Sequence, residues 1–104
     1  MNENIQVVAF ELILHSGNAR TLIHEAFANM ECGEFDEADT KLEAANDELL
    51  LAHQGQTKLL QDYASGQEIV MEIIMVHAQD HLMTTMTLKE IALRMKILYQ
   101  RTNT

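Results

Sequence analysis

The chain has very little of what usually interrupts a helix. Among its 104 residues there is no proline and no tryptophan, and there are only four glycines, whereas 47% of the residues are hydrophobic. Because helices tolerate proline and glycine least, this composition predicts long uninterrupted helices and argues against a strand-rich fold. The chain is also too short for two hydrophobic cores, so residues 1–104 are expected to form a single domain.

Other absences bear on the expected cellular location of the protein. The one cysteine, Cys32, excludes an intramolecular disulfide and favours a reduced, cytoplasmic location. No apolar run approaches the roughly 20 residues that span a bilayer. Residues Met1–Asn4 carry none of the basic side chains that begin a signal peptide. We therefore expect a cytoplasmic protein that does not insert directly into the membrane.

Basic residues are scarce. Seven Lys and Arg residues stand against sixteen Asp and Glu residues, which gives a net charge of −9. Half of the acids lie between Glu31 and Glu48, where Lys41 is the only Lys or Arg. Such a surface repels phosphate backbones and anionic lipids, which argues against a nucleic-acid partner. The acidic segment is either a solvated helix face or a docking surface for a basic protein.

Two turn signals divide the chain into three segments with helical periodicity. One is Gly33, and the other is Ser65-Gly-Gln-Glu68, which fits a capping box with Ser65 as the N-cap of a third helix running to about Gln100. The periodic positions of the first two segments are Ile5, Val8, Leu12, Ala19, Leu22, Ile23, Ala26 and Met30, then Phe35, Ala38, Leu42, Ala45, Leu49, Ala52, Gln56, Leu59 and Tyr63. Long helices joined by short turns pack as antiparallel neighbours, so the sequence predicts an all-α, up-down-up antiparallel three-helix bundle.

The third segment carries the most unusual pattern. Steps of three and four residues give a seam in which polar residues interrupt apolar ones: Ile74, His77, His81, Thr84, Leu88, Ile91, Met95 and Leu98. Asp80, three residues after His77, shares this face. Burying two imidazoles and a carboxylate is costly unless they are hydrogen-bonded, so we expect a functional site here. Apolar residues off the seam, such as Met75, Leu82 and Met83, predict self-association.

Known metal motifs do not fit the polar residues of this seam. A histidine pair at i and i+4, such as His77 and His81, can hold one metal ion. The zinc-protease motifs are not matched, however, because Ala78 stands where the general base belongs and the inverted motif needs Glu in place of Asp80. A di-iron carboxylate site is excluded because no histidine has a glutamate three residues before it. Two interpretations remain: a histidine that acts as nucleophile or ligand, or a buried histidine pair that fixes helix register.

The string Val76-His-Ala-Gln-Asp-His-Leu-Met-Thr84 closely resembles the active-site segment of the enzyme IIA components of the lactose/cellobiose type in the bacterial sugar phosphotransferase system. The resemblance covers nearly the whole chain and includes Ser16-Gly-Asn-Ala-Arg20, Gly33-Glu-Phe35, Ala52-His53 and Gln56-Thr57. It implies a small cytoplasmic phosphocarrier that forms homotrimers of three-helix subunits.

The resemblance also implies roles for particular residues. His77 matches the residue that accepts a phosphoryl group from the phosphohistidine of HPr and passes it to a cysteine of the IIB component. Asp80 matches a metal ligand, where three copies meet on the threefold axis around one Mg²⁺ ion; three carboxylates without a cation would repel one another. Gln79 and His81 match active-site neighbours that would orient or hydrogen-bond the phosphoryl group. Gly17 is expected to leave room for the His77 imidazole or its phosphate.

The implied pathway is the uptake and phosphorylation of a β-linked disaccharide, in which the membrane component IIC binds the sugar. Ala78, where we expect Gly in the lactose branch, favours the cellobiose, chitobiose and lichenan branch. The alternative function is a non-catalytic helical trimerisation or metal-binding module, whose buried polar layer fixes the oligomeric state.

The remaining histidines and the cysteine are expected to matter less. His15 should lie on or beside the seam of the first helix, facing the trimer interior, and His24 should be structural or exposed. His53 has no assigned chemical role. Cys32 is expected to be a buried or half-buried apolar residue, because the reactive cysteine of this family belongs to IIB.

Overall fold

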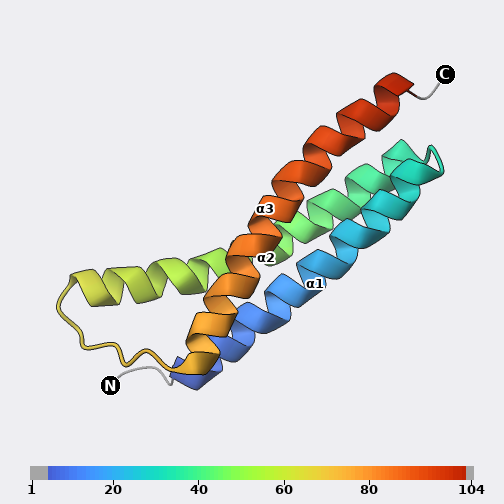
Figure 1. Cartoon of the computed structure of the whole chain (residues 1–104). Coiled ribbons are helices and arrows are strands. Elements are labelled where there is room, and N and C mark those ends of the chain that lie inside the picture. The colour runs from blue at the N-terminus through green and yellow to red at the C-terminus, as the bar shows by residue number, and fades with distance from the viewer. Residues whose placement is uncertain (1–4, 103–104) are drawn as a thin grey trace.

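The computed structural model describes residues 5–102 and, in that range, contains three α-helices and no strand. Helix α1 spans Ile5–Glu31, α2 spans Phe35–Ala64 and α3 spans Ile73–Thr102 (Figure 1). The molecule is elongated, with extents of 57 × 20 × 19 Å. Within residues 5–102, none of the helices combines the length and the apolar character that crossing a bilayer requires.

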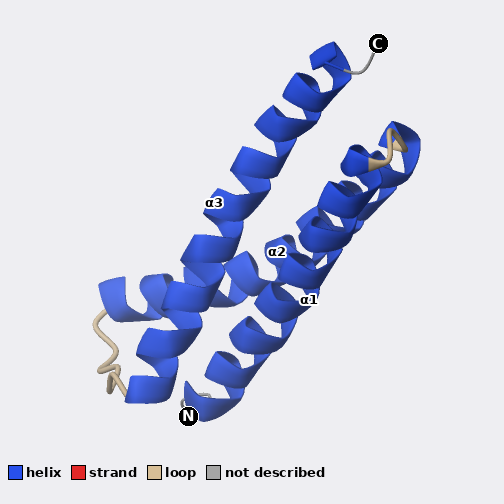
Figure 2. Cartoon of the chain, turned by 45° about the vertical axis from the view of Figure 1, so that its right-hand side comes forward, coloured by secondary structure: helices blue, strands red, loops and turns tan. Residues whose placement is uncertain are grey.

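The helices follow the predicted up-down-up order. Side-chain contacts pair the end of α1 with the beginning of α2, as in the ion pair between Glu25 and Lys41, so these helices are antiparallel. Helix α3 then runs alongside α1 in the same direction, since the beginning of α1 contacts Glu72, the residue before α3, and the middle of α1 contacts Thr85 within α3. Helices α2 and α3 contact each other least, and the C-terminal part of α3 stands apart from the other ribbons (Figure 1, Figure 2).

The core confirms the periodicity predicted for the first two helices. Most of the expected positions are buried, and the apolar core consists of Val8, Ala9, Leu12, Ala19, Ile23, Ala26, Met30, Ala38, Leu42, Ala45, Leu49, Ala52, Met75, Ala78, Leu82 and Ala92. Tyr63 is an exception, because 70% of it is exposed near the end of α2. The core is rich in alanine, which lets the helix axes approach closely.

Gly33 ends α1, as the sequence predicts. Its φ of 77° lies in the left-handed region, which glycine enters without steric cost. The Glu34 amide donates a hydrogen bond to the Asn29 carbonyl (2.8 Å), and the Gly33 amide donates to the Met30 carbonyl (3.1 Å). These two bonds form a Schellman motif, which satisfies carbonyls at the end of the helix.

The prediction that Ser65 starts the third helix is wrong. Gly66 has a φ of 100°, and the Gln67 amide donates to the Asp62 carbonyl (3.0 Å), so Ser65 and Gly66 form the C-terminal cap of α2. The Ser65 hydroxyl also donates back to the Asp62 carbonyl (2.9 Å). An irregular connection follows, and α3 does not begin until Ile73.

The predicted seam of α3 is rotated away from the core of this chain. The residues that α3 buries are Met75, Ala78, Leu82, Thr85 and Ala92. His77 and Asp80, which the seam placed inside, are exposed, whereas His81 is half-buried. Each residue turns a helix by about 100°. If the row that meets the core begins one residue later than predicted, a different face of the whole helix is therefore buried. The expectation that both imidazoles and the carboxylate are buried is therefore wrong for the single chain.

Candidate functional site

Two parallel imidazoles mark the candidate site. The rings of His77 and His81, one turn apart on α3, are stacked with an interplanar angle of 3° and a centroid separation of 6.1 Å. His77 is exposed, whereas His81 turns toward α1. A Cβ atom added to Gly17 of α1 would lie 3.7 Å from His81 Nε2. The expectation for Gly17 is thus corrected: it faces the second imidazole, not His77, at an ordinary contact distance.

An arginine from α1 is fixed next to the turn of α3 that follows His81. Arg20 Nη2 donates to Thr84 Oγ1 (2.7 Å) and Thr85 Oγ1 (3.0 Å), and Arg20 Nε donates to Thr85 Oγ1 (3.2 Å). The hydroxyls in turn donate to α3 carbonyls: Thr84 to Asp80 (2.8 Å) and Thr85 to His81 (2.7 Å). Sequence reasoning gave Arg20 no role. One signal was present, since Arg20 is the only Lys or Arg among the first forty residues.

The surroundings of His81 disfavour its protonation. Burial is the largest cause that lowers the pKa of this imidazole below its usual value of 6.5, followed by the positive charges of Arg20 and of protonated His77. Asp80 acts in the opposite direction but does not outweigh them. At neutral pH His81 is therefore mainly neutral and keeps a lone pair on one ring nitrogen.

Gln79 lies on a different side of α3 from the two imidazoles. Its Oε1 accepts a hydrogen bond from Gln56 Nε2 on α2 (2.5 Å), and its own amide points to Met75 Sδ (3.6 Å). The structure therefore brings His77 and His81 together but places Gln79 toward α2.

Asp80 is exposed beside His77 and is a candidate metal ligand. Its carboxylate takes part in no hydrogen bond or ion pair with the residues that the structure describes, so its oxygens are available to a cation. Within residues 5–102, no three His, Cys, Asp or Glu side chains come together in a metal-binding group. A single chain thus offers one hard carboxylate, a donor that suits Mg²⁺ only when water or other chains complete the coordination.

Large apolar side chains are exposed along α3. They include Ile73, Val76, Met83, Ile91, Leu93, Ile97 and Leu98. Ile73, Asp80 and Ile91 fall on one outward row of α3. Thr84 and Thr87 lie on the same row between Asp80 and Ile91, so this stripe is apolar toward its ends and polar in the middle. Large exposed apolar side chains on such a stripe mark an interaction surface.

The remaining candidates lie away from this site. His15 faces α2, where its Nδ1 is 2.9 Å from Glu48 Oε1. His24 and His53 are exposed. Cys32 is exposed as well, which contradicts the expectation that it is buried or half-buried.

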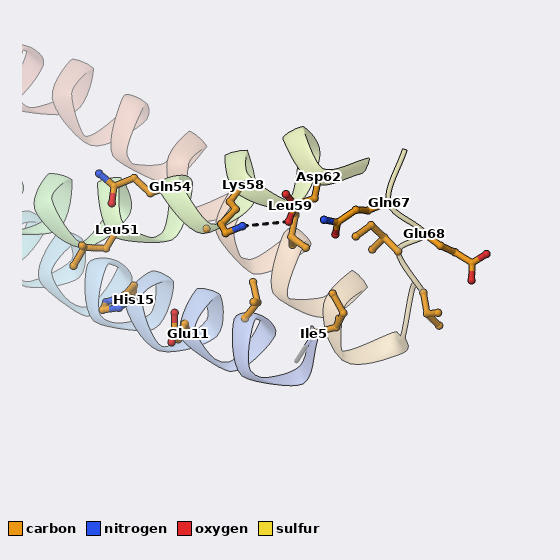
Figure 3. Close-up of a pocket in the computed structure, with 14 residues that line it drawn as sticks. Ile5, Glu11, His15, Leu51, Gln54, Lys58, Leu59, Asp62, Gln67 and Glu68 are labelled. Atoms are coloured by element: carbon orange, nitrogen blue, oxygen red, sulfur yellow. Dashed lines mark hydrogen bonds and ion pairs between the residues drawn. The ribbon is translucent and has the colours of Figure 1, made fainter. Parts of the chain in front are cut away.

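A cavity of about 450 Å³ lies between α1, α2 and the connection that follows α2 (Figure 3). Ile5, Leu59 and His15 line it, as do Lys58 and Asp62, whose charged groups are 3.4 Å apart. Neither imidazole of the stacked pair contributes to this lining. The candidate site is thus a surface on α1 and α3, open to a macromolecular partner.

Known proteins are similar to this chain in sequence and in fold. The family model described as "PTS system, Lactose/Cellobiose specific IIA subunit" matches residues 7–100. The lichenan-specific phosphotransferase enzyme IIA component of Bacillus subtilis is 45% identical over 101 residues, which cover 97% of this chain and 92% of that protein. The crystal structure of PtcA from S. mutans is 64% identical, with a TM-score of 0.93, and covers 96% of this chain and 99% of that one. A chain in the solution structures of the IIA(Chitobiose)–HPr complex of the Escherichia coli phosphotransferase system is 30% identical, with a TM-score of 0.82, covering 99% of this chain and all of that one.

Proposed function

Because this chain belongs to the lactose/cellobiose-specific IIA family of the sugar phosphotransferase system, we propose that it carries a phosphoryl group on His77. The observation that supports this choice is the exposure of the His77 ring beside a second, mainly neutral imidazole. An exposed imidazole can reach the active site of another protein, and its unprotonated nitrogen is a nucleophile near neutral pH.

The proposed donor is the phosphohistidine of HPr, and the proposed acceptor is a cysteine of a IIB component. The relative of known structure in complex with HPr supports the first of these partners. In the loading step a ring nitrogen of His77 uses its lone pair to form a new N–P bond. The N–P bond of the donor breaks, and its electron pair returns to the donor imidazole. In the second step the thiolate of IIB attacks phosphorus, and the electron pair of the N–P bond returns to His77.

The neighbours of His77 have different proposed roles. His81 is held against Gly17 and orients the phosphoryl group through a ring nitrogen. Gln79 points toward α2, so its proposed contact with a phosphoryl group is made to a neighbouring copy and not to His77 of its own chain. The hydrogen bond from Gln56 would hold the Gln79 amide in place for this contact.

We also propose that three copies assemble with their α3 stripes facing a common axis. The exposed apolar residues around Asp80 support this arrangement, since assembly would remove them from water. Asp80 from each copy would then hold one Mg²⁺ ion, which, when bound, would offset most of the repulsion among the three carboxylates. The cytoplasm is the proposed location, and the exposed thiol of Cys32 suits its reducing conditions. The transported sugar is proposed to be a β-linked disaccharide, and Ala78 and the lichenan-specific relative favour the cellobiose, chitobiose and lichenan branch over the lactose branch.

Incubation with phosphorylated HPr tests the function. The protein should acquire one acid-labile, base-stable phosphate, and His77→Ala should abolish its acquisition without loss of helix content. His53→Ala, which removes another exposed histidine, is the matched control and should accept phosphate normally. Phosphate found on His81 or elsewhere in the His77→Ala protein would show that the assignment is wrong. A parent chain that accepts no phosphate would favour the non-catalytic trimerisation module instead.

A further inference from the structure

Arg20 is a cation without an anionic partner in a strongly acidic chain. The net charge is −9, yet within residues 5–102 the contacts of Arg20 are with the hydroxyls of Thr84 and Thr85 and not with a carboxylate. Two lysines of the described residues, Lys41 and Lys96, each pair with an acid, whereas Lys89, like Arg20, donates to a neutral oxygen, that of Asn46. Because hydroxyls are neutral, these partners do not offset the positive charge of the guanidinium, which acts on nearby His81.

The hydrogen bonds of Arg20 leave part of its guanidinium fork, the planar set of N–H donors on Nε, Nη1 and Nη2, unused. A guanidinium has five N–H donors. The bonds to the two threonines come from Nε and Nη2, and Nη1 donates to none of the described residues. The two N–H groups of Nη1 are therefore available to an external acceptor, and a guanidinium matches the oxygens of a phosphoryl group better than any other side chain.

The position of this fork is fixed by both helices. Each threonine hydroxyl gives its hydrogen to a carbonyl of α3, so its lone pairs face Arg20. The guanidinium is thereby held next to the turn that carries His81, whose ring is parallel to that of His77. Its charge is close enough to affect His81 electrostatically. Little reorganisation is needed when an anion arrives, because the arginine is already ordered.

We propose that Arg20 is a phosphoryl-binding residue, which uses Nη1 and its charge to stabilise the phosphoryl group that His77 carries over the His81 ring. This inference rests on the proposed phosphocarrier function. A phosphoryl group adds about two negative charges, and here they would lie close to Asp80 on an acidic chain. Arg20 therefore helps to set how readily the chain accepts and retains the group from its donor.

The test compares Arg20→Gln with Arg101→Gln, which removes the same charge from the end of α3. The equilibrium constant for phosphoryl transfer from phosphorylated HPr is measured by ³¹P NMR on the full chain. We expect Arg20→Gln to lower it about tenfold or more, the size expected from a hydrogen bond to a charged group, and to move the phosphohistidine resonance. Arg101→Gln should change neither quantity. An equal equilibrium constant for the two variants would overturn the proposal.

A conservative variant covers the case in which Arg20→Gln does not fold. Arg20→Lys keeps the charge but lacks the planar guanidinium, whose separate nitrogens can reach the threonines and a phosphoryl group at once, so we expect a smaller loss of about threefold. An equilibrium constant equal to that of the parent would exclude a role for the fork. If the parent itself accepts no phosphoryl group, the proposed function fails and the Arg20 role with it. If the parent is phosphorylated and the Arg20 variants match it, only the role of Arg20 is wrong.

Discussion

His77 and His81 are one turn apart in a single helix, yet their surroundings give them different chemistry. The first ring is exposed, and the second is half-buried between its own helix and α1, near a fixed positive charge. A nucleophile needs access to its partner, whereas an orienting group needs a fixed position and a defined protonation state. In the proposed mechanism, exposed His77 would meet the first requirement and half-buried His81 the second.

The paired carboxylate of Glu48 should make stability depend on pH. Hydrogen bonds from His15 and then Asn18 lower the pKa of this carboxyl below its usual value of 4.5, and they outweigh the opposite effect of desolvation. Because the folded-state pKa is depressed, the stabilisation is fully present above about pH 4.5 and is lost as the pH falls through the folded-state value. We expect the free energy of unfolding to fall more steeply with acid in the parent than in Glu48→Gln. Urea titrations between about pH 3 and 6 measure both slopes.

An exposed glutamate provides the control for this pH effect. Glu43→Gln removes a carboxylate from the same helix, and it should leave the slope close to that of the parent. If Glu48→Gln also keeps the parent slope, the hydrogen bonds from α1 do not stabilise the ionised carboxyl.

At the scale of helices, the sequence predicts α1 and α2 well because each has one apolar face. Their alanines and leucines recur at helical spacing, and the buried residues follow that spacing. Helix α3 is different, since apolar residues surround it, and periodicity alone cannot decide which row meets the core. The spacing favours the row with His77, but the row with Met75 and Leu82 is the buried one. The start of α3 was missed because Ser65 and Gly66 satisfy the rules of a helix end as well as those of a helix start.

The sequence also predicts only part of the candidate site, namely the residues of the α3 motif and not their contacts with α1. The motif from Val76 to Thr84 is local, so its residues could be found by inspection. The hydrogen bond between Arg20 and Thr85 joins residues 65 positions apart, so no local sequence pattern predicts it. It depends on the packing of α1 against α3.

Gly66 and Gly17 should respond in opposite ways to the same substitution. Gly66 has a φ of 100°, and a side chain in that region costs about 1–2 kcal/mol. Gly17 lies in the middle of α1 with ordinary space around it, so alanine there should add about 0.5–1 kcal/mol to the free energy of unfolding. Urea denaturation of Gly66→Ala and Gly17→Ala should therefore move the midpoint down and up, respectively. An upward shift for Gly66→Ala would contradict the assigned cap at Gly66, and a downward shift for Gly17→Ala would contradict the ordinary space around Gly17.

At the scale of the whole molecule, the exposed apolar surface of α3 predicts assembly. Light scattering should give about three times the 11.8 kDa of one chain. Ile91→Glu, on the stripe with Asp80, should reduce the mass toward that of the monomer, because a charge would be buried at the interface. Leu51→Glu is the control: Leu51 is as exposed as Ile91, at 49%, but it lies on α2 beside the cavity. A monomeric parent, or equal dissociation of both variants, would rule out the proposed interface.

Removal of metal should affect the assembly through Asp80. A chelator should lower the melting temperature of the parent, because a cation bound only to the folded trimer stabilises it. Asp80→Leu should melt at an equal or higher temperature than the chelated parent and should not respond to the chelator, since apolar residues in place of buried charges are often neutral or stabilising. Equal sensitivity of both proteins to the chelator would show that Asp80 does not hold the ion.

The hydrogen bonds of Arg20 also bear on the order in which the chain folds. The ion pair between Glu25 and Lys41 closes a loop of 16 positions, whereas the contact of Arg20 with Thr85 closes one of 65. Because longer loops lose more entropy on closure, the α1–α2 hairpin has the advantage and α3 docks afterwards. His77 belongs to α3, the helix that docks last, whereas Arg20, the proposed phosphoryl-binding residue, belongs to α1, which pairs first with α2. A partly folded chain would therefore lack the complete proposed phosphoryl site, and the chain would become able to accept a phosphoryl group only when α3 has docked.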